Sequence, residues 1–369
     1  MEKNLNSRER IIKTLNHIEP DKIPIQDGLW QTTVERWYSE GLPRNISIDD
    51  YFGYEMKWIF PDTSPQFKPE IIEKTGDYII ERDHFGEIIK NFKNRPSTPE
   101  ILDSPVKNRS DWGELKERLI VNDSRGLSYG LCLDPGTYIT LKNGINEFKE
   151  SYAKNKFIIY GVINGNDMIQ RYVGLERLLI SIAEDPLWVK DMFKINAQLI
   201  SDMYEYMIDQ GYKFDGVFLI NDLGYRNGLL YSPRHYKELL FEYDKFLCDY
   251  FHAKNLKVFL HSCGRVEDLI PYFIEAGIDC LHPLEVKAGM DLITLKKEYG
   301  DRISFFGGID TRLYANPDLS LIEEEIKTKF EIAKKGGGYI YHSDHSIPHD
   351  VSLKQYKSIL ALVNQYGKY

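Results

Sequence analysis

Short apolar runs alternate along this chain with longer segments that repeat their apolar residues at helical spacing. The runs predict eight β-strands, and most are apolar throughout, as expected of parallel strands buried on both faces. In chain order they span residues 22–26, 56–60, 157–163, 215–220, 257–261, 279–282, 303–306 and 339–341. The alternation predicts an α/β fold with a parallel sheet. Eight units favour a closed (β/α)8 barrel, and an open doubly wound sheet is the alternative if one or two runs are not strands.

Capping residues mark several of the predicted helices. Asp185-Pro186 is typical of an N-cap followed by the first helical residue, and the helical pattern runs from there to Gly211. Ser320-x-x-Glu323 has the spacing of a capping box, and its helix is expected to end at the glycines 336–338. A leading amphipathic helix is expected over 7–16. The residues predicted to face inward are Ile11, Ile12 and Leu15 in that helix and Leu187, Met192, Phe193, Leu199, Met203 and Met207 in the helix after Asp185.

Residues 77–150 interrupt the alternation. The segments 77–82 and 87–91, joined by the turn 83–86, predict an antiparallel hairpin, and a helix is expected near 111–119. We interpret this stretch as an insertion that walls the barrel mouth within a single domain of residues 1–369. Cys132 lies in it and is expected near the mouth.

Composition and charge narrow the class of protein. A hydrophobic content of 42% suffices for a large core, and an aromatic content of 13% argues against disorder. The net charge of −9 disfavours nucleic-acid and anionic-membrane partners. Four cysteines in 369 residues do not form a disulfide framework. The polar N-terminus lacks a signal sequence and no apolar run approaches about 20 residues, so we expect a cytoplasmic protein.

The sharpest chemical feature is His261-Ser-Cys263-Gly264, which ends a predicted strand. Residues i and i+2 of an extended chain point the same way, so His261 and Cys263 are expected to face one pocket at the carboxyl end of the strand. Imidazole nitrogen and thiolate sulfur are zinc ligands. The alternative is that Cys263 is a small buried apolar residue.

A catalytic zinc needs a third protein ligand, and the final predicted strand is followed by residues that offer one. His342 and His345 lie in this segment, and Asp344 is a candidate to orient a ligand imidazole. A solvated, histidine-rich loop is the alternative. The sequence thus predicts a zinc site made of His261, Cys263 and a third ligand from this segment, His342 or His345.

Other predicted strand ends carry polar residues with open roles. Asp222 is a candidate general base or substrate contact, or an N-cap. Glu285 is a candidate ligand or proton donor, or the partner of Lys287. Asp310 is a candidate substrate contact or a cap of the next helix, and the same two alternatives apply to Asp27. Asn164 is a candidate hydrogen-bonding group for substrate, or a structural residue. Cys248 and Cys280 are expected in the core.

Several known motifs are missing from the sequence. It contains no GxxxxGK phosphate loop, no GxGxxG after a strand, no GxSxG elbow and no CxxC pair. Nucleotide-binding and serine-hydrolase functions therefore have no support.

These same residues resemble the uroporphyrinogen-decarboxylase superfamily. The most specific stretch reads HSCGRVEDLIPYFIEAGIDCLHPLEVKAGMDLITLKKEYGDRISFFGGID, from His261 to Asp310. The segments RERIIKTLNHIEPDKIPI, NDLGYRNGLLYSPRHYKELL and SDHSIPHDVSLKQY are similar to it as well. The resemblance implies a (β/α)8 barrel, in agreement with the strand count.

The superfamily contains cofactor-free decarboxylases of tetrapyrrole side chains and corrinoid-dependent methyltransferases. The decarboxylases bind polyanionic substrates with arginines after the first strand, where this chain has Asp27 and no arginine before Arg36. The methyltransferases have His-x-Cys after the fifth strand and bind zinc with a further cysteine after the last. His345 stands in that cysteine's place here, so the resemblance implies a zinc site of His261, Cys263 and His345. The resemblance is therefore closer to the methyltransferases.

The resemblance implies a zinc-dependent enzyme that moves a methyl group between a small thiol or methyl ether and a corrinoid on a carrier protein. Zinc would be the Lewis acid, with Asp222, Glu285 and His345 as catalytic residues. The residues expected to contact substrate are Asp27, Trp30, Asn164, Asp222, Tyr225 and Asp310, and Tyr231 is a further candidate for an apolar pocket. A homodimer is also expected. The alternatives are a cofactor-free decarboxylase of a tetrapyrrole or other carboxylate, and a non-catalytic binding protein on the same barrel.

Overall fold

A run of parallel strands organises the molecule. The structure is a computed structural model that describes residues 4–93, 98–129 and 138–369. Its main sheet has the order β15-β14-β13-β12-β9-β8-β1-β6-β7, parallel from β15 to β1. The parallel strands are β1 (Met56–Pro61), β8 (Phe157–Ile163), β9 (Gly216–Ile220), β12 (Lys257–His261), β13 (Cys280–His282), β14 (Ser304–Phe306) and β15 (Tyr339–Ile340). Seven of the eight predicted strands are thus confirmed, in the predicted α/β arrangement.

The remaining predicted strand, at 22–26, forms isolated bridges only, one of them a parallel bridge between Ile25 and Tyr341. Tyr341 N donates to Pro24 O at 2.9 Å, and on the other side Glu55 N donates to Ile25 O at 3.0 Å. Pro24 has no N–H of its own to donate, which shortens the ladder. The segment therefore hydrogen-bonds to residues next to both ends of the parallel run.

The strands divide the apolar core into two clusters. The larger cluster lies between the sheet and its helices. The smaller one takes alternate strand residues, as the period of two requires. Its members are Ile11, Leu15, Met56, Phe60, Phe157, Ile159, Phe218, Ile220, Phe259, Cys280, Phe306 and Ile340. Ile11 and Leu15 belong to α1 (Ser7–Leu15), which therefore covers one end of this inner cluster.

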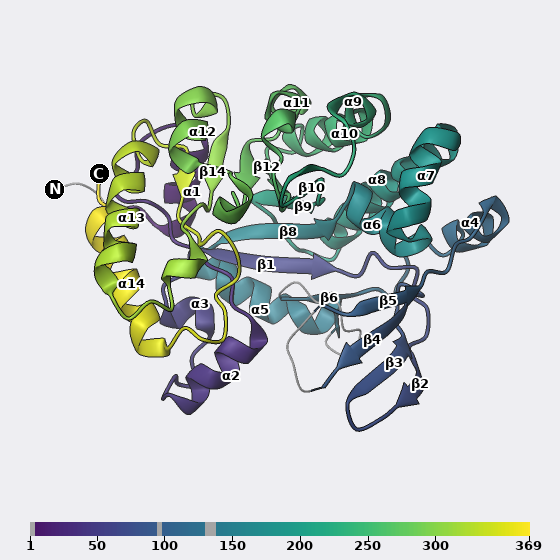
Figure 1. Cartoon of the computed structure of the whole chain (residues 1–369), viewed down its shortest axis with the longest axis horizontal. Helices are drawn as coiled ribbons and strands as arrows, with labels where there is room; N and C mark the ends of the chain where they lie inside the picture. Colours follow the sequence, from purple (N-terminus) through teal and green to yellow (C-terminus); the bar gives the residue numbers. More distant parts are fainter. Residues whose placement is uncertain (1–3, 94–97, 130–137) are drawn as a thin grey trace.

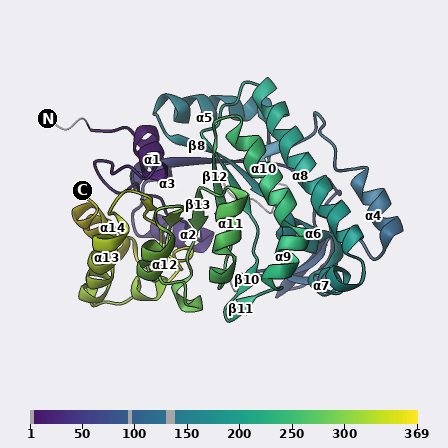
Figure 2. The same cartoon turned by 90° about the horizontal axis from the view of Figure 1, so that it is seen from above.

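Helices cover the outer face of the sheet (Figure 2). They include α5 (Leu141–Ala153), α6 (Gly165–Val173), α7 (Leu175–Glu184), α8 (Pro186–Asp209), α9 (Pro233–Leu239), α10 (Phe241–His252), α11 (Ile270–Ala276), α12 (Leu292–Tyr299), α13 (Leu319–Ala333) and α14 (Leu353–Tyr366). Two further helices, α2 (Gln31–Ser39) and the short α3 (Ile48–Tyr51), follow the first segment. None of the described helices is long and apolar enough to cross a membrane.

The helix predictions hold in outline and fail at individual residues. Asp185 caps α8 as predicted, accepting from Trp188 N. Leu187 is 75% exposed because it lies in the first turn, which extends beyond the packed face. Ile12 is exposed rather than inward. The predicted capping box at Ser320 is wrong, since Asp318 caps α13 and accepts from Ser320 N at 3.0 Å.

The predicted insertion contains more sheet than expected. The hairpin is confirmed as β3 (Tyr78–Arg82) and β4 (Ile88–Phe92), and the helix as α4 (Arg109–Lys116). Two further strands, β2 (Glu70–Lys74) and β5 (Glu100–Asp103), extend the hairpin to a four-stranded sheet. Short strands β6 (Gly126–Ser128) and β7 (Ile139–Thr140) add to the main sheet. The predicted place of Cys132 lies outside the described residues.

The β2–β5 sheet and the chain termini lie at opposite ends of the molecule (Figure 1). The arrowheads of β1 and β8 point toward the end that carries the β2–β5 sheet. The carboxyl ends of the parallel strands, where the predicted site residues lie, therefore face the side of the insertion.

Candidate functional site

Three neighbouring strands bring together the central residues of the site. His261 ends β12, and in the parallel register it lies beside Ile220 of β9 and His282 of β13. Cys263 follows two residues after His261, and Asp222 follows two residues after Ile220. Asp222 also accepts a hydrogen bond from Cys263 N at 2.6 Å, which fixes the loop after β12 against the loop after β9.

The side chains of Asp222, His261 and Cys263 have the spacing of metal ligands. His261 Nε2 lies 3.4 Å from Cys263 Sγ and 3.5 Å from Asp222 Oδ1. All three ligand atoms lie within 4.8 Å of one another, and in the described part of the chain this is the group of His, Cys, Asp and Glu residues with that property. Ligands bound tetrahedrally to zinc at about 2.0–2.3 Å are roughly 3.5 Å apart. The three side chains therefore fit zinc and leave a fourth position open.

The protonation of the Cys263 thiol and the His261 ring would also depend on whether a cation is bound. Burial raises the pKa of the Cys263 thiol well above its usual range, and the carboxylates of Asp222 and Glu285 raise it further. Burial lowers the pKa of His261, and Asp222 opposes that effect. Without a metal the thiol is protonated and the imidazole neutral. A bound divalent ion supplies the positive charge that a thiolate beside a carboxylate lacks.

His345 is not among the three residues whose ligand atoms lie within 4.8 Å of one another, so the predicted set of His261, Cys263 and His345 stays a prediction. Its ring stacks on Trp30, with ring centroids 6.1 Å apart and planes 23° apart. Burial and the charge of Lys287 lower the pKa of His345, while Glu285 acts in the opposite direction. The parallel register of β9 and β12 brings Asp222 beside His261, whereas the ring of His345 lies against Trp30 at the start of α2.

Glu285 connects the two parts of the site. It is buried, and its carboxylate accepts a hydrogen bond from the Cys263 thiol. Lys287 Nζ lies 3.9 Å from Glu285 Oε2, the pairing that the sequence offered as the alternative. Glu285 is therefore placed to take or return the proton of the thiol.

Four predicted residues are engaged in structural contacts. Asp27, with a fully buried side chain, accepts from Tyr356 Oη at 2.9 Å and Ser343 Oγ at 2.5 Å, which joins the ends of the first and last segments. Asp310 caps a short 3-10 helix and pairs with Arg312 at 2.6 Å. Other donors also occupy Asp344, which accepts from Val286 N and Thr311 N, and Asn164 donates to the buried Asp244. The carboxylate of Asp344 thus connects the loops after β13, β14 and β15, and its orienting of a ligand imidazole stays a prediction.

The predicted aromatic residues divide between surface and core. Trp30 and Tyr225 are both exposed, and Tyr225 lies in the small hairpin of β10 (Gly224–Tyr225) and β11 (Gly228–Leu229). Tyr231 is buried and its hydroxyl has no hydrogen-bond partner. Cys248 and Cys280 are buried as predicted. Of the three predicted aromatic residues, Trp30 stacks on a predicted site residue, His345.

Two residues near the group were missed from the sequence. Burial and the neighbouring charge of Asp222 raise the pKa of Asp167 to about 8, and the backbone N–H of Asp222 donates to its carboxylate. His282 lies 2.8 Å from His261, between their Nδ1 atoms. A signal existed in both cases: Asp167 opens the helix after β8, and His282 ends its strand at the same level as His261.

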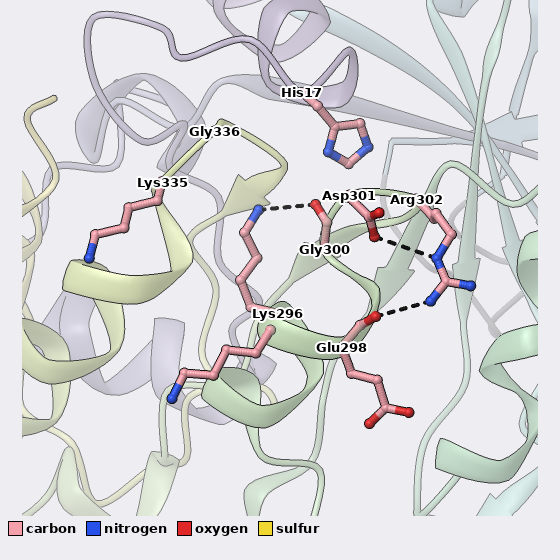
Figure 3. Close-up of a pocket in the computed structure, with 9 residues that line it drawn as sticks. His17, Lys296, Glu298, Gly300, Asp301, Arg302, Lys335 and Gly336 are labelled. Carbon is pink, nitrogen blue, oxygen red and sulfur yellow. Dashed lines mark hydrogen bonds and ion pairs between the residues drawn. The ribbon is translucent and has the colours of Figure 1, made fainter.

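A pocket of about 600 Å³ lies elsewhere, where α12 and α13 end (Figure 3). Its lining residues are His17, Lys296, Lys297, Glu298, Gly300, Asp301, Arg302, Lys335 and Gly336. Lys296 donates to the carbonyls of Gly300 and Gly337. The side chain of Lys335 points away from Lys296 and His17 (Figure 3). Lysines at helix C-termini offset the partial negative charge there. We therefore interpret this pocket as structural, and none of the predicted site residues lines it.

The chain is similar to a known protein family and to solved structures. The profile described as "Uroporphyrinogen decarboxylase (URO-D)" matches residues 167–366. Among solved structures, a "methyltransferase from Methanosarcina mazei" superposes with a TM-score of 0.65 at 15% identity, covering 98% of this chain and 99% of that one. Dispersin B overlaps with a TM-score of 0.32 at 10% identity over 62% of this chain and 76% of that chain, too little to carry an argument. A search of curated proteins found no match.

Proposed function

The chain belongs to the uroporphyrinogen decarboxylase family, and from that premise we propose that it is a zinc-dependent methyltransferase. In this proposal it moves a methyl group between a small substrate, a thiol or a methyl ether, and a corrinoid held by a separate carrier protein. The observation that carries the proposal is the spacing of Asp222, His261 and Cys263, which suits zinc with one position open to substrate. The shared fold of the methanogen methyltransferase supports it.

We infer that the fold is a closed (β/α)8 barrel formed by a single domain, with residues 77–150 as an insertion at its mouth. The segment 22–26 would be the eighth strand, because it hydrogen-bonds to residues adjoining both β15 and β1. The inner cluster of alternate strand residues is also the arrangement expected inside a barrel. The site then occupies the carboxyl end, where barrel enzymes place their catalytic groups.

Zinc in this site would act as a Lewis acid on the sulfur or oxygen that gives or receives the methyl group. Asp222, His261 and Cys263 would hold it, and Glu285 would accept the thiol proton of Cys263 as the metal binds. In ether demethylation the carbon–oxygen bond breaks, the methyl carbon passes to the reduced corrinoid co-substrate, and the oxygen leaves with the electron pair. His345 and Trp30 would contact the substrate from the opposite side and orient it.

The decarboxylase alternative has less support. A substrate with several carboxylates requires unpaired cationic side chains at the site. Of the described arginines that follow the parallel strands, Arg171 pairs with Glu87 at 2.9 Å, Arg312 with Asp310 at 2.6 Å and the exposed Arg265 with Glu267 at 3.5 Å. Arg226, in the β10–β11 hairpin, forms no ion pair in the described structure and is the one cation of this group that such a substrate could use. Asp222 and Glu285 would repel such a substrate in addition.

The first test is elemental analysis of the purified chain. We expect stoichiometric zinc in the parent, loss of zinc in Cys263→Ser and Asp222→Asn, and retention in Cys248→Ala, a matched cysteine change in the core. The second test follows methylation of free reduced cobalamin with 2-methoxyphenol, and demethylation of methylcobalamin with 2-mercaptoethanol. Zinc binding with turnover of either donor supports the proposal; a metal-free protein that forms coproporphyrinogen from uroporphyrinogen overturns it.

A further inference from the structure

The ring of His282 lies next to the candidate ligand His261 and takes part in a contact that the proposed function does not use. The Nδ1 atoms of the two rings are 2.8 Å apart, and the ring centroids are 4.9 Å apart. Two nitrogens at this distance share one hydrogen: one ring donates and the other accepts. The direction of this hydrogen bond decides which nitrogen of His261 keeps a free lone pair.

We propose that His282 is a positioning residue that holds His261 in the tautomer able to bind a metal through Nε2. Nε2 is the nitrogen that faces Cys263 and Asp222, at 3.4 and 3.5 Å. To bind a cation there, the neutral imidazole must carry its hydrogen on Nδ1 and donate it. His282 Nδ1 is the acceptor of that hydrogen. The inference rests on the proposed metal site and names the residue that prepares it.

The surroundings of His282 hold its ring in this role. It lies at the end of β13, paired in register with His261, and its carbonyl accepts from Ser262 N at 2.9 Å. Phe306 and Phe218 lie against the ring, with centroid distances of 4.6 and 5.3 Å. His342 packs edge-on at 4.6 Å. A ring fixed by the backbone on one side and aromatic rings on the others presents Nδ1 in one direction.

An imidazole acceptor also differs chemically from the usual partners of metal-bound histidines. Such histidines commonly donate to a carboxylate or a backbone carbonyl, and a carboxylate acceptor makes the ligand more basic. A neutral imidazole adds no charge behind His261. With Asp222 and Cys263 already anionic ligands, a neutral acceptor keeps the total charge on a bound zinc ion near zero.

The test compares two substitutions at residue 282, one that keeps a hydrogen-bond acceptor and one that removes it. His282→Asn keeps an acceptor oxygen near the place of Nδ1, whereas His282→Phe fits the aromatic surroundings and removes the acceptor. Zinc affinity is measured by chelator competition on the full chain, and thermal unfolding verifies that both variants fold. Losing a hydrogen-bond partner of a metal ligand weakens binding about 10- to 100-fold. We expect that loss for His282→Phe and only a small change for His282→Asn.

A second measurement needs no metal. The ¹⁵N histidine spectrum of the metal-free protein reports which nitrogen of His261 carries the hydrogen. We expect it on Nδ1 in the parent and in His282→Asn, and a shift toward Nε2 in His282→Phe. A parent His261 protonated on Nε2, or a His282→Phe variant with unchanged zinc affinity, overturns the inference. A chain that binds no zinc but shows the expected spectra refutes the proposed function and leaves the tautomer control intact.

Discussion

The buried carboxyl of Asp244 should make the stability of this protein depend on pH in a way that one substitution removes. Asp244 lies in α10, accepts from Asn164 Nδ2 at 3.0 Å and Tyr236 Oη at 2.8 Å, and is buried. Burial raises its pKa from 3.8 to about 6, with the two hydrogen bonds opposing. A folded pKa above the unfolded one means that the folded state binds the proton more tightly. The stabilising effect is complete below pH 3.8 and is lost as pH rises through 6.

The magnitude follows from the shift. About 2.2 pKa units at 1.36 kcal/mol per unit give roughly 3 kcal/mol of lost stability at pH 7 relative to acid conditions. Asp244→Asn removes the titration. Its amide oxygen still accepts from Tyr236, and its amide nitrogen finds an acceptor if the Asn164 side chain rotates. We expect the free energy of unfolding of Asp244→Asn to rise relative to that of the parent between pH 4 and pH 6. The difference between the two proteins should be constant above pH 7.

Urea unfolding of both proteins, measured from pH 4 to pH 8, checks this expectation. Subtracting the two curves removes the other titrating groups, such as Glu87, whose pKa burial raises to about 7. A difference that stays constant across the range would refute the reasoning, because it would mean that Asp244 does not change protonation. The activity of the variant adds a result for Asn164: unchanged KM supports a structural rather than substrate-binding role.

Three further predictions concern the site and the inner core. His345→Ala should keep its zinc, because His345 lies outside the ligand group, and should lose methyl transfer; loss of zinc in elemental analysis would contradict this placement. Glu285→Gln should speed alkylation of Cys263 by iodoacetamide in chelator-treated protein at pH 8, since removing the carboxylate lowers the thiol pKa; an unchanged rate counts against the contact. Ile11→Ala should cost about 2–5 kcal/mol in urea unfolding because it empties the inner cluster, whereas the exposed Ile12→Ala should be near neutral; equal losses would refute the placement of α1.

The sequence was most informative where one local rule determines the structure. Continuous apolar runs identified seven strands, and the period of two placed His261 and Cys263 on the same side of one strand end. Both inferences need only residues a few positions apart. Asp185 was recognised as a cap for the same reason, because its side chain bonds to the backbone three residues away.

Contacts that depend on distant segments could not be predicted. Asp222 was a candidate site residue, but its place beside His261, and that of the missed His282, depends on the registers of β9 and β13 against β12, which no local pattern contains. The capping box at Ser320 failed because Asp318 offers a competing acceptor two residues earlier. Asp27 was predicted to bind substrate and Asp344 to orient a ligand imidazole, and no local pattern shows that buried tyrosine and serine hydroxyls and loop amides from distant segments donate to their oxygens.

The charge around Cys263 connects these observations to the chemistry. In the metal-free chain, burial and the charges of Asp222 and Glu285 raise the pKa of the half-buried Cys263 thiol well above its usual range. Such an arrangement is unfavourable for a cysteine nucleophile, because the thiolate is the reactive form. In the proposed site a bound divalent cation would instead favour the thiolate and the Asp222 carboxylate as ligands, and Glu285 would accept the thiol proton. Zinc binding should therefore weaken as pH falls, and the loss should be smaller in Glu285→Gln, where the competing thiol proton is held less tightly.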